Sequence, residues 1–193
     1  MSQLSIHPDP TAYLLNDLSE VLCTREQIEE RLADMGRQIA TDIPEGDLLL
    51  IGVLKGGAYF LCDLSRSVPR AHAIDFMGAS SYGNATTTSG HVKITKDLDT
   101  DVRGKHVVIC EDIYDTGHTL RALKSLILTH APASVRLAAM LYKRKAHRFE
   151  MPIDYVGFHI DDVFVVGYGL DYQERYRNLR CIGVLHPRVY AEG

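Results

Sequence analysis

The 193-residue sequence lacks tryptophan, and its four cysteines are scattered, with no C-x-x-C pair. This spacing argues against a disulfide framework or a cysteine zinc site and is typical of reduced thiols in a cytoplasmic protein. Long apolar runs are also missing, since runs such as residues 48–54 fall far short of the ~20 residues that span a bilayer. No basic segment followed by an apolar run begins the sequence. We therefore expect neither a signal peptide nor a membrane span.

Strong net charge is absent as well. The sequence has 21 Lys and Arg against 25 Asp and Glu, a formal charge of -4, so bulk attraction to nucleic acid is not expected. The hydrophobic fraction of 46% and the charged fraction of 24% are close to those of average globular domains and exclude disorder. The length fits one domain.

Apolar periodicity predicts strands and helices in alternation. Thr24 and Gln27 have the spacing of a helix capping box. The expected helices cover residues 26–43, 58–64 and 119–129. The expected strands cover residues 47–54, 71–77, 106–110 and 135–142. Strand–helix–strand units of this kind predict an α/β fold with an open, mostly parallel twisted sheet flanked by helices.

The segment from Val107 to Leu120 carries the strongest functional signal. We expect a buried strand to end at Glu111 and Asp112, and a loop over 112–117 to lead into a helix. In open α/β sheets, ligands bind where strand ends face a helix N-terminus, whose N–H groups attract phosphate. Gly117 allows the backbone to approach a ligand closely, and the Thr116 and Thr119 hydroxyls add donors for a phosphate.

Glu111 and Asp112 would repel a phosphate, so they suit sugar hydroxyls instead. The loop thus predicts a ligand with a phosphate at one end and vicinal hydroxyls nearby, such as ribose 5-phosphate. The alternative is an ordinary strand-to-helix turn in which an aspartate, such as Asp115, caps the helix.

Residues 111–119 resemble the phosphoribosyl-diphosphate motif of type I phosphoribosyltransferases. This resemblance implies that the ribose 5-phosphate group is bound by Glu111, Asp112, Asp115, Thr116, Gly117, His118 and Thr119. Further segments appear in the order found in hypoxanthine-guanine phosphoribosyltransferases, and the resemblance covers about residues 18–186. These segments are Leu54–Gly57, Ser81–Gly83, Lys143–Arg144, and Phe164–Tyr172 with Arg177. The phosphoribosyl motif alone specifies the superfamily, whereas the last segment is typical of members that use 6-oxopurines.

The resemblance implies an enzyme of purine salvage. With Mg²⁺ as cofactor, it would transfer ribose 5-phosphate from phosphoribosyl diphosphate to nitrogen 9 of hypoxanthine or guanine, which gives IMP or GMP and diphosphate. Asp115 would be the catalytic acid or base at purine nitrogen 7. A homodimer or homotetramer is implied in the same way.

The resemblance also implies the residues that bind diphosphate and metal. The backbone of Leu54, Lys55 and Gly56 would bind diphosphate around a cis peptide, and the Lys55 side chain would either contact diphosphate or be solvated. Arg177 would pair with diphosphate oxygens. The implied metal ligands are Glu111 and Asp112, near the ribose hydroxyls, and Asp171, near the base.

Four residues are implied at the purine. Lys143 would donate to the 6-oxo oxygen, which disfavours adenine, and Phe164 would stack on the base. Val165 and Asp171 would face the 2-position through backbone groups. The alternative for Phe164 is a packed residue of a core strand.

The resemblance implies a small hood subdomain from about residues 1–23 and 151–193, and a core from about 45–150. Residues 78–91, rich in Gly, Ser, Thr and Asn, predict a mobile loop in which Ser81 and Tyr82 belong to a lid over the reacting centre. His118 stands where other members have lysine, so a charged phosphate contact there becomes pH-dependent or absent.

Two other functions stay open at this point. One is a regulator on the same fold that senses phosphoribosyl diphosphate and binds RNA, and the other is a transferase that prefers xanthine. Asp115 and the net negative charge favour an enzyme over the regulator.

Overall fold

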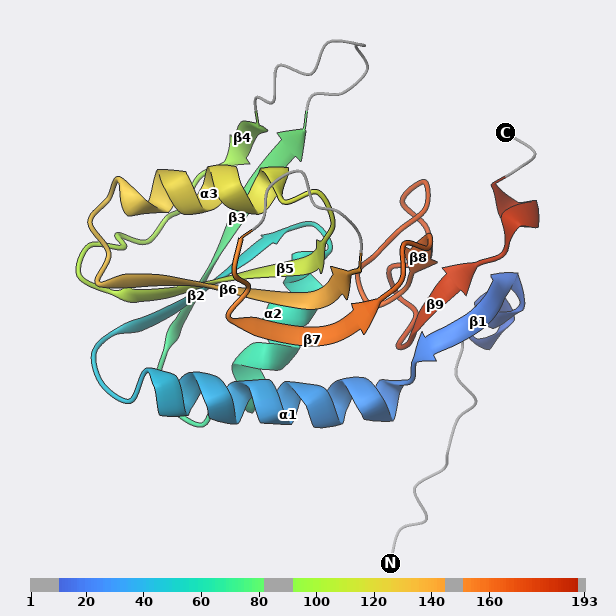
Figure 1. The fold of residues 1–193 in the computed structure, drawn as a ribbon, viewed down its shortest axis with the longest axis horizontal. Helices are drawn as coiled ribbons and strands as arrows, with labels where there is room; N and C mark the ends of the chain where they lie inside the picture. The colour runs from blue at the N-terminus through green and yellow to red at the C-terminus, as the bar shows by residue number, and fades with distance from the viewer. Residues whose placement is uncertain (1–10, 82–91, 145–150, 191–193) are drawn as a thin grey trace, which may run out of the picture.

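The computed structural model describes residues 11–81, 92–144 and 151–190. Six strands form one sheet in the order β4–β3–β2–β5–β6–β7 (Figure 1). All neighbouring strands are parallel except β3 and β4. The strands are β2 (Leu48–Leu54), β3 (Ala73–Ser81), β4 (Val92–Lys96), β5 (His106–Tyr114), β6 (Ser134–Lys143) and β7 (Tyr155–Ile160). The predicted open, mostly parallel sheet is confirmed.

Helices cover both faces of this sheet. α1 (Arg25–Asp42) and α2 (Gly57–Ser67) lie on one face, and α3 (His118–Leu128) lies on the other (Figure 1). The predicted capping box is present, because Thr24 accepts from the Gln27 N–H and Gln27 accepts from the Thr24 N–H.

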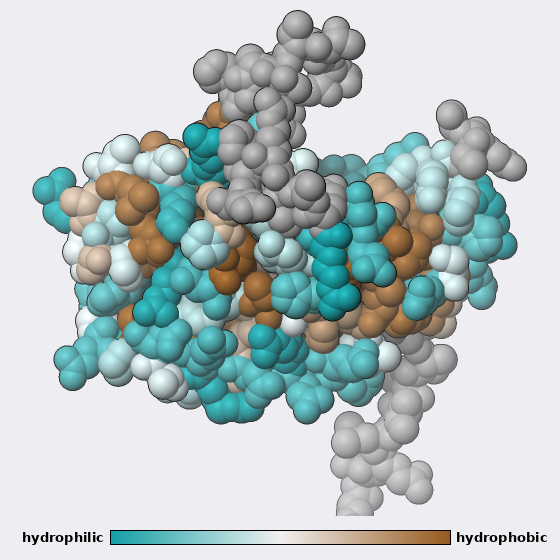
Figure 2. Space-filling view, in the orientation of Figure 1, coloured by the Kyte–Doolittle hydropathy of each residue, from teal (hydrophilic) through white to brown (hydrophobic). Residues whose placement is uncertain are grey.

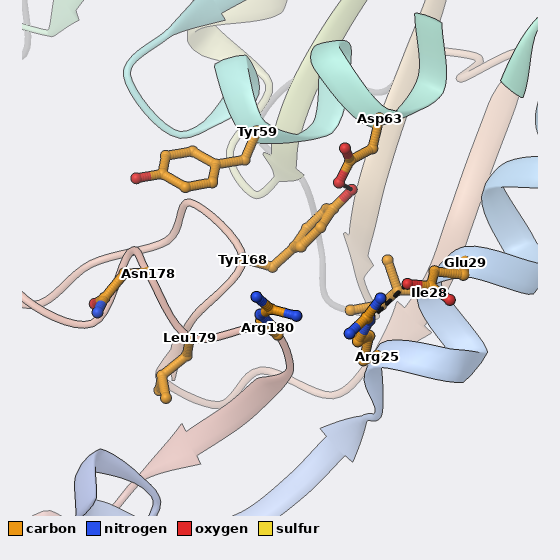
Figure 3. Close-up of a pocket in the computed structure, with 9 residues that line it drawn as sticks. All are labelled: Arg25, Ile28, Glu29, Tyr59, Asp63, Tyr168, Asn178, Leu179 and Arg180. Atoms are coloured by element: carbon orange, nitrogen blue, oxygen red, sulfur yellow. Dashed lines mark hydrogen bonds and ion pairs between the residues drawn. The ribbon is translucent and has the colours of Figure 1, made fainter. Parts of the chain in front are cut away.

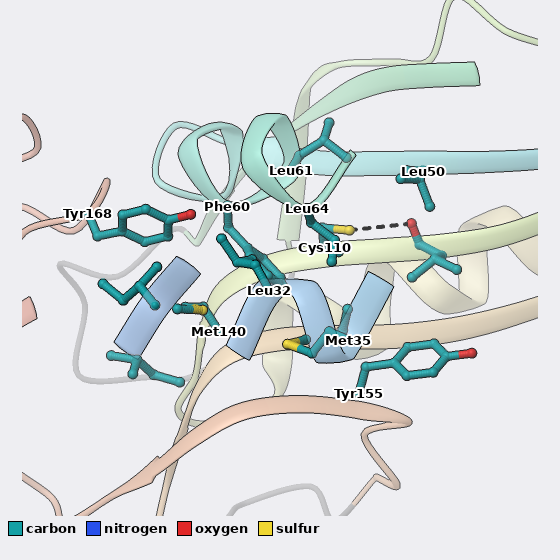
Figure 4. Packing of buried hydrophobic residues seen from close by; sticks show 14 of the residues in the cluster. Leu32, Met35, Leu50, Phe60, Leu61, Leu64, Cys110, Met140, Tyr155 and Tyr168 are labelled. Atoms are coloured by element: carbon teal, nitrogen blue, oxygen red, sulfur yellow. Dashed lines mark hydrogen bonds between the residues drawn. The ribbon is translucent and has the colours of Figure 1, made fainter. Parts of the chain in front are cut away.

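The core has two halves separated by the sheet. Along β5, Val108 and Cys110 face the cluster under α1 and α2, while Val107 and Ile109 face the cluster under α3. Figure 4 shows the first cluster, where Phe60 and Met35 from the helices pack near Cys110. Because β5 is buried on both faces, its apolar run has no alternation, as expected for a central parallel strand.

A second, antiparallel sheet forms the hood in the order β1–β9–β8. Its strands are β1 (Leu18–Cys23), β8 (Val165–Val166) and β9 (Ile182–Leu185), and the short helices η1 (Ala12–Asp17) and η2 (Pro187–Val189) flank them. The hood lies beyond the carboxyl ends of β5, β6 and β7 (Figure 1). Figure 2 shows this face of the molecule as mostly hydrophilic, with separate hydrophobic patches over the main sheet and at the hood.

Three boundaries differ from the sequence prediction. β7 was expected in the hood, but it pairs with β6 in the main sheet and buries Tyr155. β5 does not end at Glu111 and Asp112, because its backbone stays paired with β6 as far as Tyr114. Residues 78–81, expected in the mobile loop, instead extend β3 and pair with β4. Their small and polar side chains gave no sign of a strand in the sequence. The rest of that loop, Tyr82 included, lies outside the described residues.

No helix among the residues that the structure describes is long and apolar enough to cross a membrane.

Gly36 of α1 marks a close approach to the end of α2. A Cβ at Gly36 would overlap the backbone carbonyl of Ser67. Although alanine favours a helix by about 1 kcal/mol over glycine, we expect Gly36→Ala to lower the free energy of unfolding by about 1–3 kcal/mol, since the helices must move apart. Urea unfolding measures this change. The exposed Glu30→Ala should stay within about 0.5 kcal/mol, and a stabilised Gly36→Ala would contradict the packing argument.

Candidate functional site

The order of the strands opens a crevice between the ends of β2 and β5. From β2 the chain crosses to β3 on one side, and from β5 it crosses to β6 on the other. The loops after β2 and β5 therefore diverge, and open α/β sheets bind ligands at such a switch point. Leu54 ends β2 and Tyr114 ends β5, so both predicted phosphate-binding loops begin at this crevice.

The loop after β5 encloses a cavity of about 190 Å³ at the start of α3. It is lined by Glu111, Ile113, Tyr114, Asp115, Thr116, Gly117, Thr119 and Leu120. Gly117 occupies the N-cap position of α3 in a left-handed conformation, with φ 79°. N–H groups in a first helical turn have no acceptor within the helix, so this cavity suits an anion. His118 is the first residue of α3.

Asp115 is not the N-cap residue of α3, because Gly117 occupies that position. The capping alternative for Asp115 is therefore wrong. Its Oδ2 atom lies 3.6 Å from Nζ of Lys143, at the end of the neighbouring strand β6. Lys143 is nearly buried, at 11% side-chain exposure, and also pairs with Asp162 at 3.0 Å. The structure thus brings the predicted proton-transfer residue and the predicted purine donor together.

Glu111 and Asp112 place two carboxyl groups side by side within β5. Burial raises the pKa of both carboxyls, and the Asp112 charge raises that of Glu111 further. Hydrogen bonds and the nearby Arg177 oppose the effect on the pKa of Asp112. Among the described atoms, Oε2 of Glu111 is buried and has no hydrogen-bond partner. A bound group that supplies positive charge or hydrogen-bond donors here would stabilise the ionised carboxylates and give Oε2 of Glu111 a partner.

The loop after β2 touches the Asp112 carboxyl directly. The Leu54–Lys55 peptide bond is cis, as the resemblance implied. A Cβ at Gly56 would overlap Oδ2 of Asp112 and approach the carbonyl of Gly169. Only glycine allows the three segments to meet this closely.

Arg177 joins the same cluster through both ends of its guanidinium group. It donates from Nη1 to the Gly169 carbonyl at 2.7 Å and pairs through Nη2 with Asp171 at 2.8 Å and with Glu174 at 3.2 Å. Glu174 also pairs with Lys55 at 3.0 Å. The Lys55 side chain is 67% exposed, so it is both solvated and paired. The Glu174 carboxylate thus pairs with both Lys55 and Arg177, the two cations predicted near the diphosphate.

Of the predicted purine residues, Phe164 and Val165 lie at the hood, whereas Lys143 ends β6 in the main sheet. The alternative that Phe164 is a core residue is wrong, since Phe164 precedes β8 and is 44% exposed. Val165 is buried in β8. Ser81 ends β3, and Tyr82 lies outside the described residues. Within residues 11–81, 92–144 and 151–190, no three acidic, histidine or cysteine side chains cluster as a metal site. Arg177 pairs with Asp171 at 2.8 Å and also lowers the pKa of Asp112.

Sequence reasoning missed Asp162, Gly169 and Glu174, which contact Lys143, Arg177 and Lys55. Glu174 is 119 residues from Lys55, and no periodicity or motif in the sequence links residues so far apart. It also missed a cavity of about 310 Å³ between α1, α2 and the segment before β9, into which Tyr168, Arg25 and Arg180 project (Figure 3).

Comparison with known proteins agrees with this geometry. A model of the phosphoribosyl transferase domain matches residues 23–173, most of the chain. With the switch-point cavity and the paired carboxyls, this match defines the chain as a phosphoribosyltransferase.

Full-length relatives identify the branch of that class. The chain is 47% identical to the hypoxanthine-guanine phosphoribosyltransferase of Mycobacterium tuberculosis, over 98% of this chain and 97% of the relative. It is 44% identical to the same enzyme of Bacillus subtilis, over 91% and 97%. A crystal structure of a Staphylococcus aureus hypoxanthine phosphoribosyltransferase superposes with a TM-score of 0.90 at 41% identity, over 94% of this chain and 99% of that one. The chain belongs to the hypoxanthine-guanine phosphoribosyltransferase family, as its motifs predict.

The buried carboxyl pair predicts a pH-dependent effect on stability. Because the pKa of Glu111 is raised in the folded state, the contribution of this one group to stability falls as pH rises above about 4.5, the ordinary value for glutamate. We expect Glu111→Gln to melt above the wild type at pH 8 without metal, and the difference to shrink towards pH 4.5. Melting curves from pH 4.5 to 8 with a chelator measure it. The exposed Glu30→Gln should show no such trend, and a Glu111→Gln that melts lower at pH 8 would refute the burial argument.

Proposed function

We propose that this enzyme transfers ribose 5-phosphate from phosphoribosyl diphosphate to nitrogen 9 of hypoxanthine, guanine or both, and so makes IMP or GMP in purine salvage. The observation that carries the proposal is the 3.6 Å contact between Asp115 and Lys143. It joins the loop that lines the anion cavity to the residue proposed to contact the purine, so that sugar phosphate and base would meet there.

Each end of the proposed substrate has a matching group. The 5-phosphate would accept from the first-turn N–H groups of α3 and from the Thr116 and Thr119 hydroxyls. The leaving diphosphate would pair with Arg177 and contact the backbone of Leu54, Lys55 and Gly56. Glu174 now forms ion pairs with Arg177 and Lys55, and these ion pairs must break when the diphosphate binds the two cations.

At the purine, Lys143 would donate to the 6-oxo oxygen, and Asp115 would hold or remove the proton at nitrogen 7 while nitrogen 9 attacks the ribose. An adenine amino group cannot accept from Lys143 as the oxo group does, so adenine should be rejected. Phe164 would stack on the base, and Val165 and Asp171 would face its 2-position.

The carboxyl pair fits Mg²⁺, which binds through one or two carboxylates and completes its shell with substrate oxygens and water. Glu111 and Asp112 would hold one ion near the ribose hydroxyls, and the partnerless Oε2 atom of Glu111 supports this. Asp171, now paired with Arg177, would hold another. Mg²⁺ bound at these residues would neutralise negative charge that develops on the leaving diphosphate.

A homodimer or homotetramer and a cytoplasmic location complete the proposal. The four cysteines are free thiols, which supports a reducing compartment.

Steady-state turnover with phosphoribosyl diphosphate and Mg²⁺ tests the reaction on five bases: hypoxanthine, guanine, xanthine, adenine and uracil. We expect turnover of the 6-oxopurines and a fall of about 10²- to 10⁴-fold in Asp115→Asn. The exposed Asp34→Asn serves as control. Xanthine as the best base would favour a xanthine transferase. Tight binding of phosphoribosyl diphosphate without turnover of any base would sink the enzyme proposal, and RNA binding would be measured next.

A second variant tests recognition of the 6-oxo group. Lys143→Met should lower kcat/KM for hypoxanthine by about 10- to 100-fold, the loss of a hydrogen bond from a charged donor. The KM for phosphoribosyl diphosphate should change little. Arg103→Met, at the opposite end of the sheet from the crevice, removes an exposed cation as control. An equal fall in kcat/KM for hypoxanthine and for phosphoribosyl diphosphate would contradict a specific contact between Lys143 and the 6-oxo group.

A further inference from the structure

Three aromatic rings meet at the hood, next to the proposed purine site. The Phe164 and Tyr190 ring centroids are 5.6 Å apart, those of Phe164 and Tyr172 are 5.9 Å apart, and those of Tyr172 and Tyr190 are 6.3 Å apart. The rings come from three segments: the residue before β8, the turn after Leu170 and the end of η2. We call Phe164, Tyr172 and Tyr190 the aromatic triad.

The triad is not a core cluster. Phe164 is 44% exposed and Tyr190 is 39% exposed. The planes of Tyr172 and Tyr190 make angles of 89° and 49° with that of Phe164, so neither tyrosine lies parallel over the phenylalanine. The tyrosines therefore contact Phe164 without stacking on it, which leaves ring surface for a flat ligand.

Backbone hydrogen bonds hold Tyr190 in register with Phe164. The Leu185 N–H at the end of β9 donates to the Phe164 carbonyl at 3.1 Å. His186 then donates to Asp17 at 2.8 Å, and the Tyr190 N–H donates to the Pro187 carbonyl at 3.2 Å. The short helix η2 is thereby fixed at both ends, and it delivers the Tyr190 ring to Phe164.

We propose that Tyr190 is a positioning residue for the purine, acting through Phe164 with the help of Tyr172. An exposed phenylalanine without neighbours samples several rotamers, and ordering it on binding weakens affinity. Contact with Tyr190 holds the ring in one orientation before the base arrives. The proposal rests on the proposed function, because it takes Phe164 as the surface on which the base stacks.

Kinetics of Tyr190→Ala and Tyr190→Phe test the proposal. Tyr190→Ala should raise the KM for hypoxanthine about three- to tenfold, the range of one aromatic contact. The KM for phosphoribosyl diphosphate and kcat should stay within about twofold of wild type. Tyr190→Phe should restore the wild-type KM, because the ring and not the hydroxyl makes the contact. Tyr13→Ala removes a hood tyrosine that is 70% exposed and should change neither KM.

A double-mutant cycle with Phe164→Ala shows whether Tyr190 acts through Phe164. In the Phe164→Ala background, Tyr190→Ala should add no further rise in the hypoxanthine KM. An undiminished effect there, or an equal change in both substrates' KM values, would overturn the proposal.

Calorimetric binding of GMP gives a readout that does not need turnover. Tyr190→Ala should weaken GMP binding about three- to tenfold, while Tyr190→Phe should match wild type. If wild type binds GMP but turns over no base, the proposed reaction fails and the GMP affinities still decide the role of Tyr190. If wild type binds no GMP, the same titrations with IMP decide the role of Tyr190, and a wild type that binds neither nucleotide would overturn both proposals.

Discussion

The contact between the Asp112 carboxyl and the backbone at Gly56 is the constraint on which the site depends. It requires glycine on the loop after β2 and a carboxyl fixed on β5. β5 provides that fixed position because its first half is buried between two hydrophobic clusters and its second half stays paired with β6. The core thus fixes where the charged groups of the site lie.

The charges of the site are arranged at a cost to stability. Two adjacent carboxyls on a central strand raise each other's energy when ionised. Arg177 partly offsets this at Asp112, but it is itself shared with Asp171 and Glu174. Such incompletely compensated charge is typical of sites that bind ions and phosphates, because the ligand supplies the missing partners.

The hood completes the site from the far end of the chain. β9 pairs with β8 on one side and with β1, from the N-terminal segment, on the other, so residues from both ends of the sequence form one small sheet beyond the strand ends. That sheet carries Phe164 and leads directly to Asp171 and Arg177. The aromatic triad also depends on the end of the chain, because Tyr190 follows η2 among the last described residues.

Local patterns in the sequence determined most of the elements and the family. The capping box of Thr24 and Gln27, the apolar run of β5 and the segment 111–119 depend on residues close in sequence, and short-range sterics and hydrogen bonds govern them. The wrong predictions concern long-range pairing. β7 joins β6, residues 78–81 join β4, and β5 continues past its carboxyls, because strand pairing depends on neighbours distant in sequence. Tertiary structure alone decided that Asp115 lies beside Lys143 and is not the N-cap residue of α3, that Phe164 is exposed, and that Glu174 pairs with Lys55 and Arg177. Each of these contacts depends on packing between separate segments, which no local propensity encodes.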